Sequence, residues 1–197
     1  MADLKSEIIR RSILDHKGLI QSLEDNADFQ KKIEEAARLC IGSIRNEGKV
    51  LFCGNGGSAA DAQHLATELS GKFYLERDPV FAEALHVNTS FVTAVGNDYD
   101  FSEIFARSIK AKGRRDDVLI GLSTSGNSRN VVKAVIAARE KGMKVIAMTG
   151  QTGGELKESC DVLLNVPSDD TPRIQEMHIL IGHIICEMIE YSLFHQD

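Results

Sequence analysis

The sequence predicts an α/β fold: a doubly wound, flavodoxin-like sheet of five parallel strands, preceded by two helices. Two observations support this fold. Short apolar runs recur after residue 48, and helical patterns separate most of them. Strands joined by helical crossovers form a parallel sheet that is covered by helices on both faces. We therefore expect one domain over 1–197, with a helical extension at 1–47 and an α/β core at 48–197.

The elements follow from the spacing of apolar residues and from the residues that interrupt it. Amphipathic helices are expected at 4–23 and 29–44, and Gly48 is expected to end the second. The segment 72–83 is rich in charge and carries Pro79, so we expect an irregular or mobile loop there. The five strands are expected at 49–53, near 84–87, and at 118–122, 145–148 and 162–166.

The composition is that of a soluble globular protein. The chain of 197 residues is 43% hydrophobic and 26% charged, which excludes disordered, collagen-like and membrane-spanning classes. Its formal net charge is −6, whereas a surface built for nucleic acid needs a basic stripe. We expect neither nucleic acid nor a membrane as a partner.

Two features favour a cytoplasmic location. The first helical segment alternates charged and apolar residues, unlike the apolar core of a signal peptide. The four cysteines lie far apart in apolar surroundings and form no C-x-x-C pair. We expect them to be buried free thiols rather than disulfides or metal ligands. They are Cys40, Cys53, Cys160 and Cys186.

The most informative motif is the serine-rich turn Ser123–Ser128, with the sequence STSGNS. It follows an apolar run and precedes a helical pattern that begins at Val131. Backbone N–H groups and the positive end of the helix dipole point outward at such a turn, and four hydroxyl groups add further donors. Because the turn contains no basic residue before Arg129, it suits a small phosphorylated metabolite that binds and leaves.

A glycine-rich loop, Gly54–Ser58, follows the first expected strand. It reads as a tight strand-to-helix turn in which Ser58 is the helix N-cap and Asp61 completes an arrangement like a capping box.

The same loop also fits the G-x-G-x-x-A pattern of dinucleotide sites through Gly54, Gly56 and Ala59. Such a site needs an acidic residue at the end of the second strand to hold the ribose. Asn88 and Thr89 stand there instead, so we disfavour a dinucleotide site.

Two helices carry histidines that suit a metal or acid–base site. His64 and Glu68 are four residues apart, so both project from one helix face and either share a metal or form an ion pair. On the last helix, His183 shares a ridge with Gln175, and Glu176 also projects near His183. Spacing alone therefore does not choose between Gln175 and Glu176.

The last helix has side chains to bury on two sides. An apolar stripe runs from Met177 to Met188, and the ridge that ends at His183 lies roughly opposite. We expect this helix to lie between its own sheet and a neighbouring subunit. His178 falls at the edge of the stripe and is expected to be a core or interface histidine.

Taken together, these residues resemble the sugar-isomerase (SIS) domain superfamily and, within it, the phosphoheptose isomerase family. The resemblance covers essentially the whole chain. The serine turn alone marks only the superfamily, whereas the glycine loop together with the histidines, the glutamate and the glutamine is more specific. The motifs are Gly54–Ala62, His64–Glu68, Gly96–Asp98, Ser123–Ser128 and Gln175–His178 continuing to His183.

The resemblance implies an aldose–ketose isomerase that interconverts sedoheptulose 7-phosphate and D-glycero-D-manno-heptose 7-phosphate. This reaction is the entry to nucleotide-activated heptose for lipopolysaccharide or capsule. The resemblance also implies a homotetramer with active sites near subunit contacts and one zinc ion per subunit.

The resemblance further assigns roles to individual residues. Glu68 is the candidate base and His183 the candidate acid of an enediol mechanism. The zinc ligands would be His64, Glu68, Gln175 and His183, and the phosphate ligands would be Ser123, Thr124, Ser125 and Ser128. The sugar pocket would be lined by Asn55, Gly56, Gly57, Glu68, Asn97, Asp98 and Gln175.

A non-catalytic SIS protein is the alternative. Such a protein senses a sugar phosphate or binds a partner such as a replication initiator on the same scaffold. A sensor needs the phosphate turn, but it does not need His64, Glu68 and His183 together, so their joint presence favours the enzyme.

Overall fold

The computed structural model describes residues 2–195 and contains a five-stranded parallel sheet in the order β2-β1-β3-β4-β5. The doubly wound α/β prediction is therefore confirmed. The strands are β1 (Val50–Cys53), β2 (Ala82–Ala84), β3 (Val118–Ser123), β4 (Lys144–Thr149) and β5 (Val162–Asn165). The helices are α1 (Ala2–Glu24), α2 (Ala27–Arg45), α3 (Gly57–Ser70), α4 (Thr89–Asp98), α5 (Ile104–Lys112), α6 (Arg129–Glu140) and α7 (Thr171–Phe194), with short 3-10 helices η1 (Phe101–Glu103) and η2 (Gly154–Glu158).

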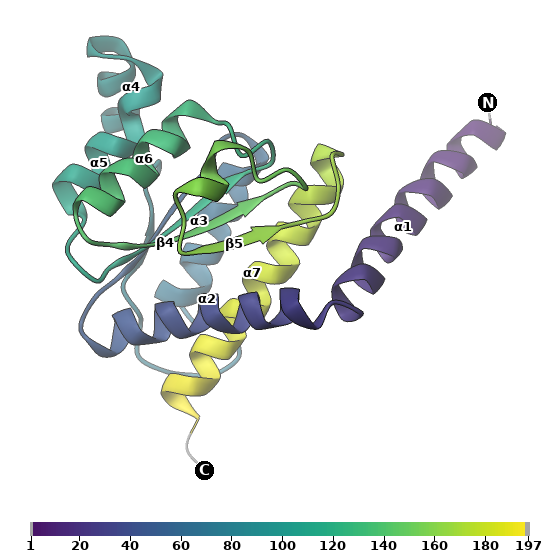
Figure 1. Ribbon diagram of the computed structural model, residues 1–197, viewed down its shortest axis with the longest axis horizontal. Coiled ribbons are helices and arrows are strands. Elements are labelled where there is room, and N and C mark those ends of the chain that lie inside the picture. Colours follow the sequence, from purple (N-terminus) through teal and green to yellow (C-terminus); the bar gives the residue numbers. More distant parts are fainter. Residues whose placement is uncertain (1, 196–197) are drawn as a thin grey trace.

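Helices cover both faces of the sheet (Figure 1). Alternate residues of a strand point to opposite faces, and β1 shows this directly: Val50 and Phe52 pack with α2, α3 and α7, whereas Leu51 and Cys53 pack with α5 and α6. Every residue of β1 and β3 is buried, as expected for central strands of a sheet between two helical layers.

The second helix ends at Arg45, one residue beyond the expected 44, and Gly48 takes part in ending it as expected. The Gly48 N–H donates to the carbonyl of Ser43 at 2.9 Å, and Glu47 has a positive φ of 58°. These bonds close the last turn before the chain enters β1. A Cβ on Gly48 would overlap the Ser43 hydroxyl, so the close return of the chain requires glycine there.

The second strand is also displaced, because β2 spans Ala82–Ala84 rather than 84–87. It is an edge strand that pairs only with the first three residues of β1, and the chain then turns toward α4, which Asn88 caps. The expected loop at 72–83 is irregular as far as Phe81, but its last two residues belong to β2. Its backbone is tied to α7 by Glu190, so it is an anchored segment.

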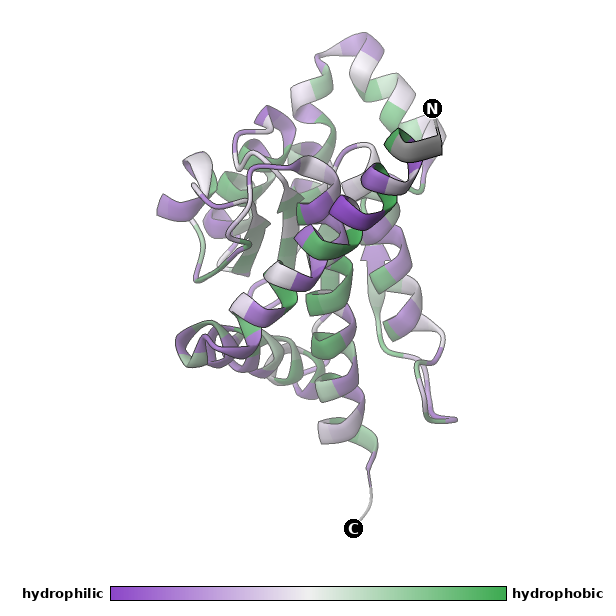
Figure 2. Cartoon of the chain, turned by 90° about the vertical axis from the view of Figure 1, so that its right-hand side faces the viewer, coloured by the Kyte–Doolittle hydropathy of each residue, from purple (hydrophilic) through white to green (hydrophobic). Residues whose placement is uncertain are grey.

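Helix α1 extends away from the sheet, and α7 crosses the body of the molecule (Figure 1). Figure 2 shows that much of α7 is apolar. It is the one helix within 2–195 with the length and composition of a membrane-spanning helix, and 44% of its most apolar stretch is buried. Because it packs against α2 and α3, this is weak evidence for a membrane span.

The cysteines are free thiols, as expected, and Cys40, Cys53 and Cys186 are buried, whereas Cys160 is only half-buried. Burial raises the pKa of the Cys53 thiol to about 12. This thiol is therefore protonated at neutral pH and unreactive, although it ends the strand that leads into the glycine loop.

The buried histidine predicts a pH dependence of stability. His178 is fully buried, as the apolar stripe indicated, and its Nε2 lies 3.1 Å from the Thr149 carbonyl oxygen. Burial lowers its pKa from 6.5 to about 4, so the unfolded chain binds a proton between these pH values while the folded chain does not. The contribution of neutral His178 to the free energy of unfolding is therefore fully present above pH 6.5 and is lost as the pH falls toward 4. We expect His178 to account for a loss of about 2 kcal/mol between pH 7 and pH 5.

Urea unfolding of the wild type and of His178→Gln at both pH values measures this contribution. The amide keeps a donor for Thr149 but does not titrate, so the variant should lose less stability on acidification. Equal losses in the two proteins would contradict the assignment.

Candidate active site

The glycine loop and the serine turn meet at the carboxyl ends of β1 and β3. These strands are neighbours, and the connections that leave them run to opposite sides of the sheet, which makes this edge a topological switch point. The side-chain amides of Asn55 and Asn130 join the two loops through reciprocal hydrogen bonds of 2.8 and 2.7 Å. Both motifs singled out in the sequence therefore lie next to each other at this edge of the sheet.

The serine turn presents a cluster of hydroxyl groups at the amino end of α6. The Ser123 Oγ lies 2.9 Å from the Ser128 Oγ and 3.5 Å from the Ser125 Oγ. Gly126 has a φ of 69°, and a Cβ there would overlap the Gly153 carbonyl, so the turn requires glycine at this position. Neutral donors at the positive end of a helix form an anion site.

The glycine loop begins α3 two residues earlier than expected. Gly56, with a φ of 55°, is the N-cap, and Ser58 lies buried inside the first turn, so the predicted N-cap at Ser58 is wrong. Asp61 closes no capping box: its Oδ2 is buried without a hydrogen-bond partner among residues 2–195, and burial raises the pKa of this carboxyl. The Gly57 backbone lies against the Gln175 side-chain amide, where a Cβ would come within 2.6 Å.

Helices α3 and α7 run side by side in the same direction and bring three polar side chains together. The His64 Nε2 lies 2.9 Å from the His183 Nε2 and 3.2 Å from the Glu68 Oε1. All three donor atoms lie within 4.8 Å of one another. The side chain of His64 is half exposed, and an open groove of about 490 Å³ lies in front of it, lined by Ala60, Gln63, His64, Thr67 and Glu68.

This cluster fits a zinc ion. Two imidazoles and one carboxylate form a known catalytic donor set, and bonds of about 2.1 Å place tetrahedral donors roughly 3.4 Å apart. The observed separations of 2.9 and 3.2 Å are near that value. Without an ion, the two imidazole nitrogens would have to share a single hydrogen between them.

The fourth expected ligand does not join the other three in this chain. Gln175 precedes His183 by eight residues, which is about 12 Å along a helix, and its amide lies against Gly57. Glu176 faces away, toward α1: its carboxylate accepts a hydrogen bond from Arg173 at 2.5 Å, and its Oε2 lies 2.9 Å from the His16 Nδ1. The structure thus separates the two candidates that spacing left open, because Gln175 faces the glycine loop.

Asn97 and Asp98 end α4 and are exposed. Their side chains bond to each other at 2.9 Å, and within residues 2–195 no hydrogen bond joins them to the glycine loop or the serine turn. The sequence analysis did not single out two residues that lie at the site. Asn130 could have been found, because it is a polar residue in the buried first turn of α6. Phe73 could not, because it lies in an irregular segment and only the fold brings its ring centroid to 5.6 Å from that of His183.

Comparison with known proteins explains this set of residues. The sequence profile described as "SIS domain" matches residues 17–150. The chain belongs to the SIS domain family. A phosphoheptose isomerase of Rhodospirillum rubrum is 57% identical over 84% of this chain and 88% of its own length, and one of Helicobacter pylori strain P12 is 49% identical over 97% and 98%.

A solved structure from this family has the same fold. The phosphoheptose isomerase of Neisseria gonorrhoeae superposes with a TM-score of 0.88 at 45% identity, covering 94% of this chain and 98% of that one. Identity at this level over nearly the full length places the chain among the phosphoheptose isomerases of the SIS family. The resemblance inferred from the motifs is therefore confirmed.

Proposed function

We propose that this protein is an aldose–ketose isomerase that converts sedoheptulose 7-phosphate to D-glycero-D-manno-heptose 7-phosphate. The observation that carries the proposal is the convergence of His64, Glu68 and His183 in a chain that shares about half its residues with phosphoheptose isomerases. A sugar-phosphate sensor or initiator-binding protein would need the anion turn but not this cluster. The product would enter nucleotide-activated heptose synthesis for lipopolysaccharide or capsule.

The reaction needs a base and an acid. A proton moves between C1 and C2 and another moves between the two oxygens, through an enediol. We propose that the Glu68 carboxylate removes the carbon-bound proton and that His183 exchanges protons with the oxygens. Their place on adjacent parallel helices lets both reach one substrate from the same side.

This edge of the sheet supplies separate places for the phosphate and the sugar. The hydroxyls that converge at the start of α6 suit the phosphate, and the amide pair between the two loops holds Asn55 toward the sugar chain. The proposed phosphate ligands are Ser123, Thr124, Ser125 and Ser128, and the proposed sugar ligands are Asn55, Gly56, Gly57, Glu68, Asn97, Asp98 and Gln175.

We further propose that His64, Glu68 and His183 hold one zinc ion per subunit and that Gln175, supplied by a neighbouring subunit, is a fourth, exchangeable ligand. A bound zinc ion would act as a Lewis acid on the substrate carbonyl. Within one chain the Gln175 amide lies against Gly57, away from the cluster, so the three ligands of that chain leave one tetrahedral position open. Glu68 would then serve through one oxygen as ligand and through the other as base.

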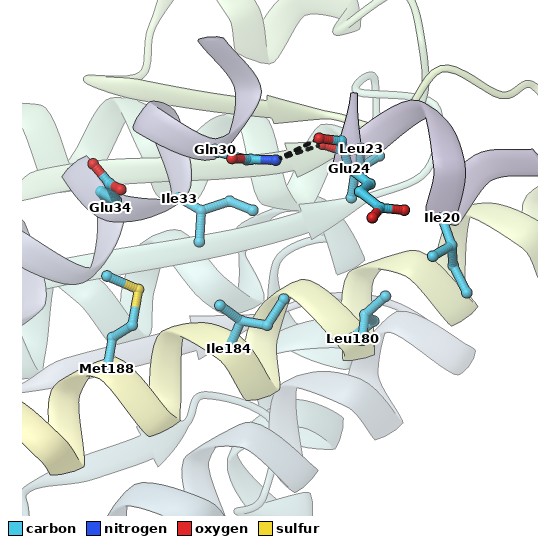
Figure 3. A pocket seen from close by; sticks show the side chains of 9 residues that line it. All are labelled: Ile20, Leu23, Glu24, Gln30, Ile33, Glu34, Leu180, Ile184 and Met188. Carbon is cyan, nitrogen blue, oxygen red and sulfur yellow. Dashed lines mark hydrogen bonds between the residues drawn. The ribbon is translucent and has the colours of Figure 1, made fainter. Parts of the chain in front are cut away.

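The proposed assembly is a homotetramer, with residues 1–47 as a helical extension of the α/β core. An apolar groove of about 450 Å³ lies between α1, α2 and α7, and Figure 3 shows that Ile20, Ile33, Leu180, Ile184 and Met188 line it. Helix α1 also exposes apolar side chains, among them Ile9 and Ile13 at 62% and 63% exposure. A second copy of the chain would cover both surfaces. A cytoplasmic location suits the buried free thiols and the phosphorylated substrate.

The first prediction tests the reaction. Glu68→Gln should lower kcat about 10²- to 10⁴-fold, because the amide keeps the shape of the side chain but cannot accept the carbon-bound proton. Incubation with sedoheptulose 7-phosphate and detection of the aldose by NMR measures turnover. The exposed Glu140, at the end of α6, provides the control Glu140→Gln. Near-normal turnover by Glu68→Gln would remove Glu68 as the base.

The second prediction concerns the metal. Protein purified without chelator should contain one zinc per subunit, and His64→Ala or His183→Ala should lose it, whereas Gln175→Ala should retain most of it. Metal analysis and thermal unfolding with and without added zinc measure this, since a ligand that binds only the folded chain raises Tm. If the purified protein contains no metal, and added zinc changes neither its activity nor its Tm, the metal site is refuted. The isomerase proposal could still stand in that case.

The third prediction concerns assembly. Ile184→Asp should dissociate the oligomer, because a carboxylate in the apolar groove would be buried without a partner. Ile136→Asp, on α6 and 48% exposed, is the control that should leave assembly intact. Sedimentation velocity at micromolar concentration measures the mass, and a monomeric wild type would contradict the proposed assembly.

A further inference from the structure

A buried ion pair joins the end of α3 to α7, close to the His64, Glu68 and His183 cluster. The Arg77 Nε lies 2.9 Å from the Glu190 Oε1, and both side chains are only 2% exposed. Charges removed from water in this way are costly unless every donor and acceptor is used. The partners of the two side chains therefore show what the pair holds in place.

Glu190 holds the backbone that follows α3. Its Oε1 accepts the Phe73 N–H at 3.1 Å, and its Oε2 accepts the N–H groups of Tyr74 and Leu75 at 2.7 and 3.0 Å. Burial by itself raises the pKa of this carboxyl, but the three backbone donors and Arg77 outweigh it and leave the pKa below its ordinary value. Glu190 is therefore ionised at neutral pH and fixes three consecutive residues.

Arg77 closes the last turn of α3, which carries Glu68. Its Nη2 donates to the Glu68 carbonyl at 2.9 Å, and its Nη1 donates to the carbonyls of Leu69 and Gly71 at 3.0 and 3.2 Å. The last carbonyls of a helix have no partners within the helix, and a cation is favourable at that end. One guanidinium thus caps the turn from which the proposed base projects.

The same contacts align α3 with α7. Glu190 follows His183 by seven residues, or about two helical turns, so the two side chains leave the same face of α7. The facing residues come in the same order along the chain: Glu68 lies at the cluster with His183, and the segment 73–77, which follows it, lies at Glu190. The segment that Glu190 holds also carries Phe73, whose ring lies 5.6 Å from the His183 ring.

We propose that Arg77 and Glu190 are positioning residues for the isomerisation. They hold the helix turn that carries Glu68, and the ring of Phe73, against His183, so that the base and the acid face one substrate. Neither is a catalytic residue, because both side chains are only 2% exposed and use their polar groups on the protein itself. This inference rests on the proposed function, and it concerns the alignment of Glu68 with His183 rather than binding of the phosphate, which is proposed for other elements.

The chain contains a matched control at the opposite edge of the sheet. The Lys49 Nζ lies 2.8 Å from the Asp117 Oδ2, with the side chains 8% and 1% exposed. Asp117 also accepts backbone N–H groups, from Lys49 and Arg114. Because β1 and β3 begin at Val50 and Val118, this pair lies at the amino ends of the strands, away from the proposed site.

The experiment compares Glu190→Gln with Asp117→Asn. Each change leaves a buried cation without its counter-charge, so both variants should lose roughly 10 °C in Tm. With kcat measured per folded molecule well below Tm, Glu190→Gln should lose about 10- to 100-fold. Asp117→Asn should stay within about twofold of the wild type, and KM should change little in either variant.

Arg77→Lys keeps the charge but loses the forked donors to α3, so it tests the same idea if Glu190→Gln does not fold. It should fold and lose at least about fivefold in kcat with little change in KM. Wild-type kcat per folded molecule in Arg77→Lys or Glu190→Gln, or equal losses in Glu190→Gln and Asp117→Asn, would overturn the positioning role. An inactive wild type would refute the proposed function instead, so the two failures are distinguishable.

Discussion

The close parallel packing of α3 against α7 is the constraint on which the site depends. Gly182 makes this packing possible, because a Cβ there would overlap the side chain of Leu65. The next residue along α7 is His183, and the residue before Leu65 is His64, so the glycine sets how near the two imidazoles come. A larger residue at 182 would push the helices apart by several tenths of an ångström or more, and interiors packed at near-crystalline density do not absorb such shifts locally.

The sheet supplies the second half of the site. Parallel strands end together at one edge, and the change of direction between β1 and β3 opens that edge for a ligand. The fold places neutral hydroxyls and a helix N-terminus there, while the helix pair alongside carries the titratable groups. Under the proposed function, the phosphate would bind at the serine turn and the reaction would take place at the helix pair, so different elements would carry binding and chemistry.

Helix α7 combines these roles within an apolar sequence. Three of its polar side chains have specific partners: His178 on the sheet, His183 in the cluster, and Glu190 on Arg77 and the segment after α3. The rest of the helix packs against α2, α3 and the sheet, or lines the apolar groove. Its hydropathy therefore reflects a helix that is covered on several sides, which is the arrangement expected for a helix with two bodies to contact.

The sequence by itself determined the features that depend on neighbouring residues. The alternation of apolar runs and helical patterns predicts the parallel sheet, and the turns at 54–58 and 123–128 are recognisable because glycine and hydroxyl residues have strong local preferences. Tertiary structure decided the rest. The start of α3 at Gly57 and the separation of Gln175 from Glu176 depend on how α7 packs, and the Arg77–Glu190 pair joins residues 113 positions apart. No local pattern encodes such contacts, because the free energy of a buried charge is set by partners that only the complete fold brings within reach.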